Sequence, residues 1–276
     1  MRKNGFLAES TKEQAIKKLS TIEIKMGYPD EIKPFWFKLV FDEDASYFEE
    51  MQTLFAIRIQ DQLDKALKPV DRTRWQMPGH MVNAGYDPSS NDITFPAAIL
   101  QKPFYSLQQS VSENLGGIGA VIGHEISHAF DNNGANFDEN GNLKNWWTEE
   151  DFTAFQELTK GMIEQFDGIE FHGGKINGEL TISENIADNG GVGVTLEIMH
   201  TLPEPDFRAY FINWARVWCR KAKEEYLQLL LSSDVHSPGE LRANMQPRNF
   251  PEWYETFGVT EHDGMYIAPE KRISIW

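Results

Sequence analysis

Apolar residues recur along the chain at two spacings, and each spacing predicts a different kind of element. Where they stand three or four positions apart, an amphipathic helix is expected. The segment 148–166 is the clearest case, because Thr148 can cap its start and three acidic residues fill its first turn, where the helix dipole favours negative charge. The same spacing predicts helices over 11–26 (capped by Thr11), 43–67, 107–130, 181–200 and 205–231.

Two short segments instead favour strands. Residues 81–86 and 92–95 flank the turn sequence DPSSN, so they predict a β-hairpin, and Pro96 ends the second strand or marks it as an edge. Turns or loops are expected at 27–30, 132–142 and 173–178, and an irregular tail from residue 234. With no repeat and no evident linker, we expect one domain over residues 1–276, mainly α with a small β-sheet (α+β).

Composition narrows the class of protein. The 276 residues, 41% of them hydrophobic, suffice for a folded core. The formal charge of −16 disfavours binding to nucleic acid or to anionic membranes. Cys219 is the only cysteine, which excludes an internal disulfide and fits a reducing compartment. No stretch is apolar enough to cross a bilayer and no signal peptide is visible at Met1, so a bacterial cytoplasmic location is expected. Removal of an upstream signal or anchor would leave an extracellular location open.

The segment GHEISHAFD at 123–131 contains a His-Glu-x-x-His motif. On a helix, His124 and His128 share a face and can bind one zinc ion. Glu125 lies beside them and can take a proton from a water held by the metal. The alternative is a helix that carries two histidines one turn apart by chance. The glycines around the motif either permit close approach of a neighbouring helix or weaken this one.

A catalytic zinc needs a third protein ligand. The segment TISENIADNGG at 181–191 supplies Glu184, with Asp188 one turn later on the same face. Glu184 is expected to bind the metal, and Asp188 to accept a hydrogen bond from a ligand histidine and so fix its tautomer. The alternative is an acidic first turn that only stabilises a helix N-terminus.

Several segments together resemble the neprilysin and endothelin-converting-enzyme family of zinc peptidases, and especially its bacterial oligoendopeptidase O branch. The matching segments, whose order and spacing are specific, are VNAGYDPSSNDITFPAAILQKPF at 82–104, GHEISHAFD at 123–131, NWWTEED at 145–151, NGELTISENIAD at 177–188, VWC at 217–219, DVHSPGELR at 234–242 and a closing tryptophan. The resemblance implies a thermolysin-like zincin catalytic domain that binds one Zn²⁺.

The resemblance also implies roles for individual residues. Asn83 and Ala84 match a substrate-binding strand to which the peptide adds as a further strand. His236 matches a histidine that stabilises the developing oxyanion, and Arg242 matches an arginine that binds a substrate carbonyl. Without the resemblance, His236 reads as a loop residue and Arg242 as a surface charge. An apolar pocket for the residue after the scissile bond is implied at five positions that would otherwise read as core: Ile99, Phe104, Val121, Val217 and Trp218.

The chain departs from the family pattern at four points. Gly85 replaces the aromatic residue usual after Asn-Ala, Ser183 stands where glycine often precedes the glutamate, and Cys219 lacks the partner with which it pairs in animal members. The long N-terminal helical segment that caps the family's active site is not in this sequence, and we expect the chain to be joined to it normally. The resulting hypothesis is a zinc endopeptidase that cleaves oligopeptides before a bulky apolar residue. The alternative is a catalytically weak or silent zinc-binding fragment that acts as a peptide-binding module.

Overall fold

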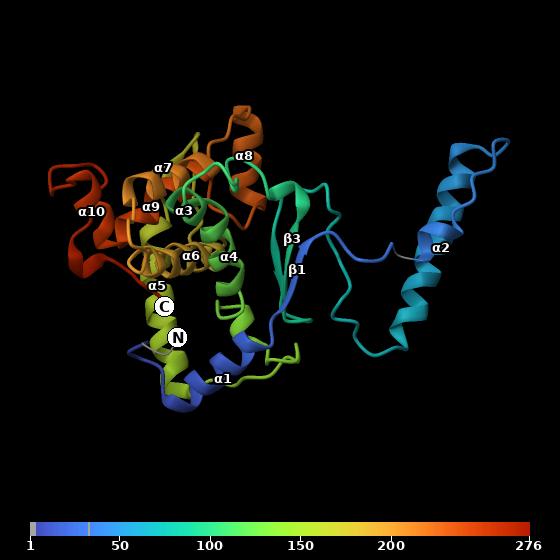
Figure 1. Cartoon of the computed structure of the whole chain (residues 1–276), viewed down its shortest axis with the longest axis horizontal. Coiled ribbons are helices and arrows are strands. Elements are labelled where there is room, and N and C mark those ends of the chain that lie inside the picture. Colours follow the sequence, from blue (N-terminus) through green and yellow to red (C-terminus); the bar gives the residue numbers. More distant parts are fainter. Residues whose placement is uncertain (1–3, 33) are drawn as a thin grey trace.

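Helices are the main regular elements of the structure, a computed structural model that describes residues 4–32 and 34–276. The central helix is α6 (Ile182–Met199), which packs against α4 (Ala120–Ser127) and α5 (Glu149–Phe166) (Figure 1). The other helices are α1 (Glu9–Ser20), α2 (Tyr47–Ala66), α3 (Val111–Asn114), α7 (Phe207–Val217), α8 (Glu224–Ser233), α9 (Gly239–Met245) and α10 (Pro251–Phe257). The expectation of a mainly α fold with a small sheet is confirmed.

The principal sheet has three strands in the order β1-β3-β2. The predicted hairpin forms from β2 (Gly85–Asp87) and β3 (Asp92–Pro96), which run antiparallel, while β1 (Glu23–Gly27) pairs with β3 in parallel. Pro96 is the last residue of β3, in agreement with the sequence. A separate two-stranded ribbon joins β4 (Glu170–Phe171) to β5 (Gly174–Lys175). Among the described strands, β2 pairs only with β3, so its other edge is free.

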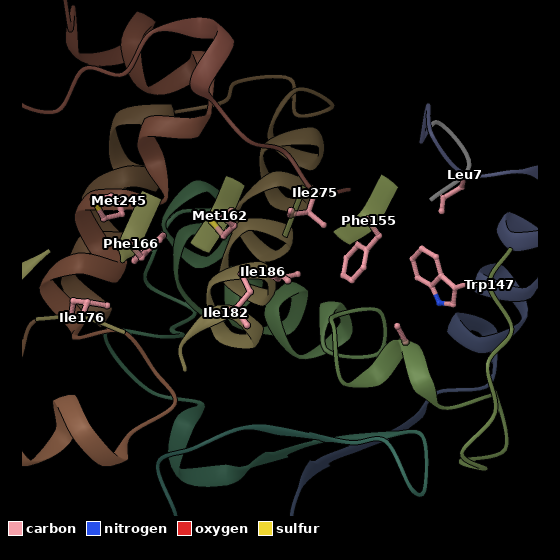
Figure 2. Packing of buried hydrophobic residues seen from close by; sticks show 11 residues of the cluster. Leu7, Trp147, Phe155, Met162, Phe166, Ile176, Ile182, Ile186, Met245 and Ile275 are labelled. Atoms are coloured by element: carbon pink, nitrogen blue, oxygen red, sulfur yellow. The ribbon is translucent and has the colours of Figure 1, made fainter. Parts of the chain in front are cut away.

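The core surrounds α6 on several sides. Ile182 and Ile186 of α6 pack with Phe155, Met162 and Phe166 of α5 in one cluster (Figure 2). The next turns of α6 contact α7 in a second cluster, which contains Val192, Leu196, Met199, Tyr210, Phe211 and Trp214. A helix that is buried almost all round has little freedom to shift, because the surrounding side chains are close-packed. The residues that α6 presents near its N-terminus are therefore held firmly.

Glycines let α4 approach α6 very closely. A Cβ built on Gly191 of α6 would lie 2.4 Å from the carbonyl oxygen of Ala120 and 2.8 Å from the backbone nitrogen of His124. A Cβ on Gly123 of α4 would lie 2.9 Å from the Gly191 Cα. Such separations leave no room for a side chain, so the glycines around the motif serve close helix packing.

The sequence placed several boundaries wrongly. Residues 23–27 form β1 instead of the last turns of a helix, because they pair with β3 across the chain, and α1 begins at Glu9 with Ala8 as its N-cap instead of Thr11. The predicted helix over 205–231 is two helices, α7 and α8, and the tail from 234 contains α9 and α10. The strand expected from residue 81 begins at Gly85.

The helix α2 lies apart from the remaining elements (Figure 1). It is well formed locally, since Ser46 and Glu49 make a reciprocal capping box at its start. None of its side chains is buried, and Phe48 and Phe55 are 68% and 53% exposed. The predicted amphipathic pattern is thus present in α2, but within the described part of the chain its apolar side is not covered.

Candidate metal centre and active site

The His-Glu-x-x-His motif lies at the C-terminal end of α4. The preceding run from α3 is continuous except for a π-helical turn, Leu115–Gly119, in which the carbonyl oxygen of Phe104 accepts a hydrogen bond from the Ile118 amide (2.7 Å). A side chain at Gly117 would collide with that carbonyl. The predicted helix over 107–130 is therefore shorter and kinked, as is common where a backbone group inserts into the helical ladder. His124 and Glu125 are buried, and His128 is partly so.

His124 is oriented by the residue that the sequence nominated. Its Nδ1 lies 2.8 Å from Oδ1 of Asp188 on α6. Asp188 is fully buried and also accepts two hydrogen bonds from Arg242, from Nε (2.8 Å) and from Nη2 (2.7 Å). The Arg242 guanidinium stacks over the Trp218 ring at 3.7 Å. An imidazole that donates Nδ1–H to a carboxylate presents the lone pair of Nε2, the tautomer required of a metal ligand.

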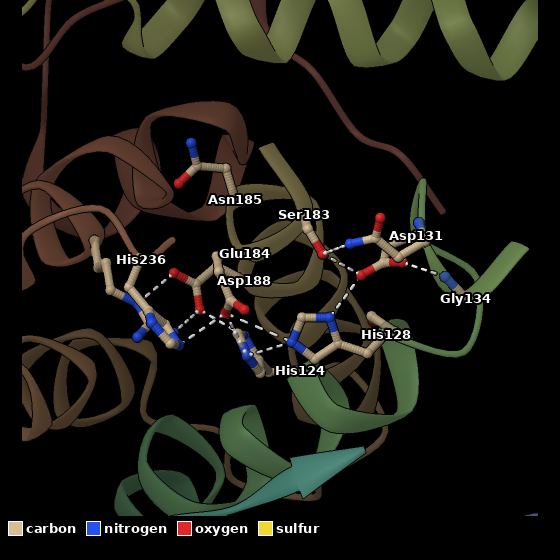
Figure 3. A network of polar contacts seen from close by, with 12 residues as sticks. His124, His128, Asp131, Gly134, Ser183, Glu184, Asn185, Asp188 and His236 are labelled. Carbon is tan, nitrogen blue, oxygen red and sulfur yellow. Dashed lines mark hydrogen bonds and ion pairs between the residues drawn. The ribbon is translucent and has the colours of Figure 1, made fainter. Parts of the chain in front are cut away.

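His128 has an equivalent partner that the sequence analysis missed. Its Nδ1 lies 2.6 Å from Oδ2 of Asp131. The other oxygen of Asp131 accepts hydrogen bonds from the amides of Asn133 (2.8 Å) and Gly134 (2.7 Å), and Ser183 donates its hydroxyl proton to Oδ2 (Figure 3). Asp131 follows His128 by three positions, so the helical spacing carried a signal for this contact.

The free nitrogens of the two histidines converge on Glu184 (Figure 3). Its Oε2 lies 3.2 Å from His124 Nε2 and 3.5 Å from His128 Nε2, and those two nitrogens are 3.0 Å apart. With both Nδ1 atoms donating to carboxylates, the two Nε2 lone pairs would face each other, an arrangement that a proton or a metal ion between them stabilises. Glu184 Oε2 is buried and has no hydrogen bond of good geometry. One ion about 2.0–2.2 Å from each of the three atoms is compatible with these separations.

This donor set is therefore suited to zinc. Two imidazole nitrogens and one carboxylate oxygen form one of the ligand sets of catalytic zinc sites, which leave a fourth position open. Glu125 also has a carboxylate oxygen within 4.8 Å of ring nitrogens of both histidines. Glu184 Oε2 lies at 3.2 and 3.5 Å from those nitrogens and is therefore the better placed of the two carboxylates to complete this donor set.

The charges of the cluster are strongly coupled. Burial works against ionisation of Glu184, but its close contacts with the rings of His124, His128 and His236 hold its pKa well below the usual range. Burial lowers the pKa of His128, yet contacts with Asp131 and Glu184 outweigh it and raise that pKa well above the ordinary value.

The pKa of Glu125 is shifted in the opposite direction to that of Glu184. Its burial raises the pKa of the carboxyl group above the usual value for glutamate, although His124 and His128 lower it. A raised pKa lies closer to neutral pH, which makes the carboxylate a more effective proton acceptor and suits a general base. Glu125 stands beside the converging nitrogens without lying between them.

A cavity of about 480 Å³ contains these groups and most of the residues implied by the family resemblance. Asn83 and Ala84 line it just before β2, not within the strand, so they extend the free edge of the sheet toward the cluster. The cavity is also lined by Ile99, Phe104, Val121, Trp218, His236 and Arg242. Val217 does not line it and faces a neighbouring cavity instead. Arg242 is buried rather than a surface charge.

His236 borders this cavity from the segment between α8 and α9. Its Nε2 lies 3.1 Å from Glu184 Oε2, and its Nδ1 lies 2.8 Å from Oδ1 of Asp234. The side chain keeps 43% of its surface exposed, so one face of the ring is open. Burial lowers the pKa of His236, but the contact with Glu184 outweighs it and raises that pKa overall.

One residue outside all these predictions stabilises the loop after the motif. The Nζ of Lys18, on α1, is buried and donates to the carbonyl oxygens of Ala129, Gly134 and Phe137, each at 2.7 Å. Gly134 therefore donates its amide to Asp131 and offers its carbonyl to Lys18. Nothing in the local sequence signals a contact between segments this far apart.

The α+β fold, with an acidic residue of one helix beside a His-Glu-x-x-His motif on another, is a zincin fold. The sequence model of Peptidase family M13 matches residues 83–273, and the chain belongs to this family. It is 50% identical over 281 residues to a neutral endopeptidase of Lactococcus lactis subsp. lactis, covering 100% of the chain and 44% of that protein. It is 37% identical over 294 residues to human neprilysin, covering 98% of the chain and 39% of that protein.

Solved structures agree. A crystal structure of PEPO from Lactobacillus rhamnosis superposes with a TM-score of 0.95 at 48% identity, covering all of this chain and 44% of that one. The Mycobacterium tuberculosis zinc metalloprotease ZMP1, in complex with an inhibitor, gives a TM-score of 0.91 at 37% identity over 99% of this chain and 44% of that one. The chain thus spans about 44% of the length of these relatives. Among the described residues, no helix combines the length and apolarity needed to span a membrane.

Proposed function

We propose that this chain carries the catalytic centre of a zinc-dependent endopeptidase, with His124, His128 and Glu184 holding one zinc ion. The observation that carries the proposal is the convergence of two histidine nitrogens, each backed by a buried carboxylate, on the orphaned Glu184 oxygen. The activity of the named relatives supports it. When bound there, zinc supplies Lewis acidity, which polarises a carbonyl and lowers the pKa of water.

In this proposal Glu125 moves the protons. Its carboxylate accepts a proton from the attacking water and later donates it to the amine that leaves. The raised pKa that burial gives Glu125 supports both steps, since the group must accept and release a proton near neutral pH. The imidazole of His236, exposed to the same cavity, donates a hydrogen bond to the oxygen on which negative charge develops.

Peptide binding is proposed at the free edge of β2. Asn83 and Ala84 stand at this edge within the cavity, where an extended peptide can add as a further strand held by main-chain hydrogen bonds. Ile99, Phe104 and Val121, with Trp218, give the cavity an apolar wall, which supports a preference for a bulky apolar residue after the cut. The expectation that an N-terminal segment caps this cavity remains a prediction.

A quenched-fluorescence peptide with a phenylalanine or leucine after the expected cut tests the function. The chain should cleave it, a chelator should abolish cleavage, and added zinc should restore it. Metal analysis should find about one zinc per chain. Protein that binds one zinc and the peptide but never cleaves it would support the alternative, a silent peptide-binding module. Less than a tenth of an equivalent of zinc after purification and reconstitution would overturn the metal assignment itself.

A further inference from the structure

A second cavity, larger than the first, lies directly beside the metal cluster. Its volume is about 1110 Å³, against about 480 Å³ for the cavity that contains the cluster. The two cavities share four lining residues, namely Val82, Trp218, His236 and Arg242. The two cavities therefore adjoin at these four residues.

The walls of this cavity are mostly apolar. Val217, at the end of α7, faces it, and α8 contributes Leu227 and Leu230. The ribbon of β4 and β5 closes another side through Phe171. These side chains come from three separate segments, so the cavity is a feature of the tertiary fold.

Two cations stand in the loop between α7 and α8 and line the same cavity. Arg220 and Lys221 are both exposed, and the ion pairs of the described residues include neither. Arg220 lies over the ring of Tyr226 at 5.1 Å, a contact that leaves its hydrogen-bond donors available. In a chain of formal charge −16, these two adjacent cations give the cavity a locally positive rim.

The other charged groups around the cavity do not neutralise this pair. Arg242 is committed to Asp188, and Asp234 accepts hydrogen bonds from the backbone and the ring of His236. Glu240 is exposed and also lines the cavity, without an ion pair among the described residues. Even with Glu240 counted, two free cations face one free anion.

We infer that this cavity binds the part of the substrate that follows the scissile bond, and that Arg220 and Lys221 select a carboxylate in that part. The inference rests on the proposed function. The cavity is assigned to residues after the cut because Trp218 and Val217, which are expected to contact the first of those residues, also line this cavity. Exposed cations attract a carboxylate through direct hydrogen bonds and through a field that salt screens.

Quenched peptides of one core sequence test the inference. In one series an aspartate replaces asparagine at successive positions after the cut, and in another the C-terminus is a free acid or an amide. The parent chain should cleave at least one acidic peptide with a higher kcat/KM than its neutral twin. In the double variant R220Q/K221Q that preference should fall by about five- to tenfold, while kcat/KM for the neutral peptide stays within about twofold.

Lys223→Gln is the matched control, because it removes a positive charge from the same loop at a residue that does not line the cavity. It should leave the preference unchanged, and the preference of the parent should weaken as salt is raised. The two series separate a side-chain carboxylate from the C-terminal one. Equal responses of acidic and neutral peptides to R220Q/K221Q in both series would overturn the inference.

Binding measured without turnover separates this inference from the proposed function. Fluorescence anisotropy measures the binding of a labelled acidic peptide to zinc-loaded Glu125→Gln protein. Combining Glu125→Gln with R220Q/K221Q in one protein should weaken this binding by about five- to tenfold. If no peptide is cleaved but the acidic peptide still binds through these cations, the proposed function fails, while carboxylate recognition by Arg220 and Lys221 stands. If peptides are cleaved with no preference for a carboxylate, the proposed function stands and the present inference fails.

Discussion

Asp188 and Arg242 form a bidentate pair directly behind the cluster of His124, His128 and Glu184. Arg242 donates to both carboxylate oxygens of Asp188, while Oδ1 of Asp188 also contacts Nδ1 of His124. Arg242 thereby holds the Asp188 carboxylate in place, and this carboxylate in turn orients the His124 ring. Burial opposes the charge on Asp188, but Arg242 and His124 hold the pKa of this carboxyl group at about 2. The pair thus remains ionised near neutral pH.

Substitution of Asp188 by asparagine should weaken metal binding and stability together. The new amide group presents a donor to two groups that are themselves donors, and Arg242 loses its counter-charge. We expect a 10- to 100-fold (about 1.4–2.7 kcal/mol) loss of zinc affinity and a loss of about 3–5 kcal/mol in the free energy of unfolding. Chelator competition and urea denaturation measure the two quantities. Asp44→Asn makes the same chemical change at an exposed site, and similar effects in both variants would count against the assigned role.

Ser183→Ala should weaken the positioning of His128, and with it zinc binding. The Ser183 hydroxyl donates to Asp131, the partner of His128, and accepts a hydrogen bond from the Asn133 side chain (3.2 Å). Its loss leaves the Asp131 carboxylate with its backbone donors but without one side-chain donor. We expect zinc affinity to fall by up to about tenfold, with partial rescue by Ser183→Thr. Ser232→Ala removes a hydroxyl that bonds only to the Leu229 carbonyl of its own helix. An unchanged zinc affinity in Ser183→Ala would contradict this reading of the network.

Gly191→Ala should force α4 and α6 apart. The added methyl would lie 2.4 Å from the Ala120 carbonyl oxygen and 2.8 Å from the His124 nitrogen, and both are rigid backbone atoms. We expect a loss of about 1–3 kcal/mol in the free energy of unfolding and weaker zinc binding. Gly193→Ala is the matched control on the same helix, since its methyl meets only the Phe250 ring at 3.3 Å. Alanine favours helix there, so equal destabilisation in the two variants would refute the argument from helix spacing.

Lys18 should give stability a distinctive dependence on pH. Burial lowers the pKa of Lys18 from 10.5 to about 8, although Asp131, Asp138 and Glu139 oppose the shift. Between those values the unfolded chain binds more protons than the folded one, so the contribution of Lys18 to stability rises with pH over this window. Below about pH 8 both states are protonated, so the contribution no longer changes with pH. The unfolding free energy of the parent minus that of Lys18→Met should therefore increase from pH 7.5 to pH 10. A difference that stays constant or shrinks would contradict the buried-lysine account.

The sequence predicted the elements whose signals are local. Helix α5 was predicted because Thr148 caps it and acidic residues fill its first turn, and the structure confirms that cap (Asp151 amide to Thr148, 3.2 Å). The break between α7 and α8 was not predicted, because residues 218–223 contain neither glycine nor proline. There the position of Trp218 against Arg242 depends on α9, which local periodicity cannot reveal. Strand β1 was missed for the same reason, since its partner β3 lies far along the chain.

The candidate site likewise combines contacts that the local sequence predicts with contacts that only the folded chain reveals. Helical spacing alone placed His124 beside His128 and Glu184 beside Asp188, and the glycines between the helices explain how the two pairs meet. Asp131 was within reach of the same reasoning, three residues after His128. Ser183 and Lys18 act across segments 52 and 111 residues apart, and only the folded structure brings them to their partners.

The central claim is that Glu125 acts as the base beside a zinc ion held by other residues, and Glu125→Gln tests it most directly. The variant keeps the size of the side chain and all three proposed ligands. We expect it to retain about one zinc per chain and the thermal stability of the parent, while peptide hydrolysis falls by about 10²- to 10⁴-fold. A variant that loses its zinc, or that keeps its zinc and hydrolyses the peptide at the rate of the parent, would contradict the account.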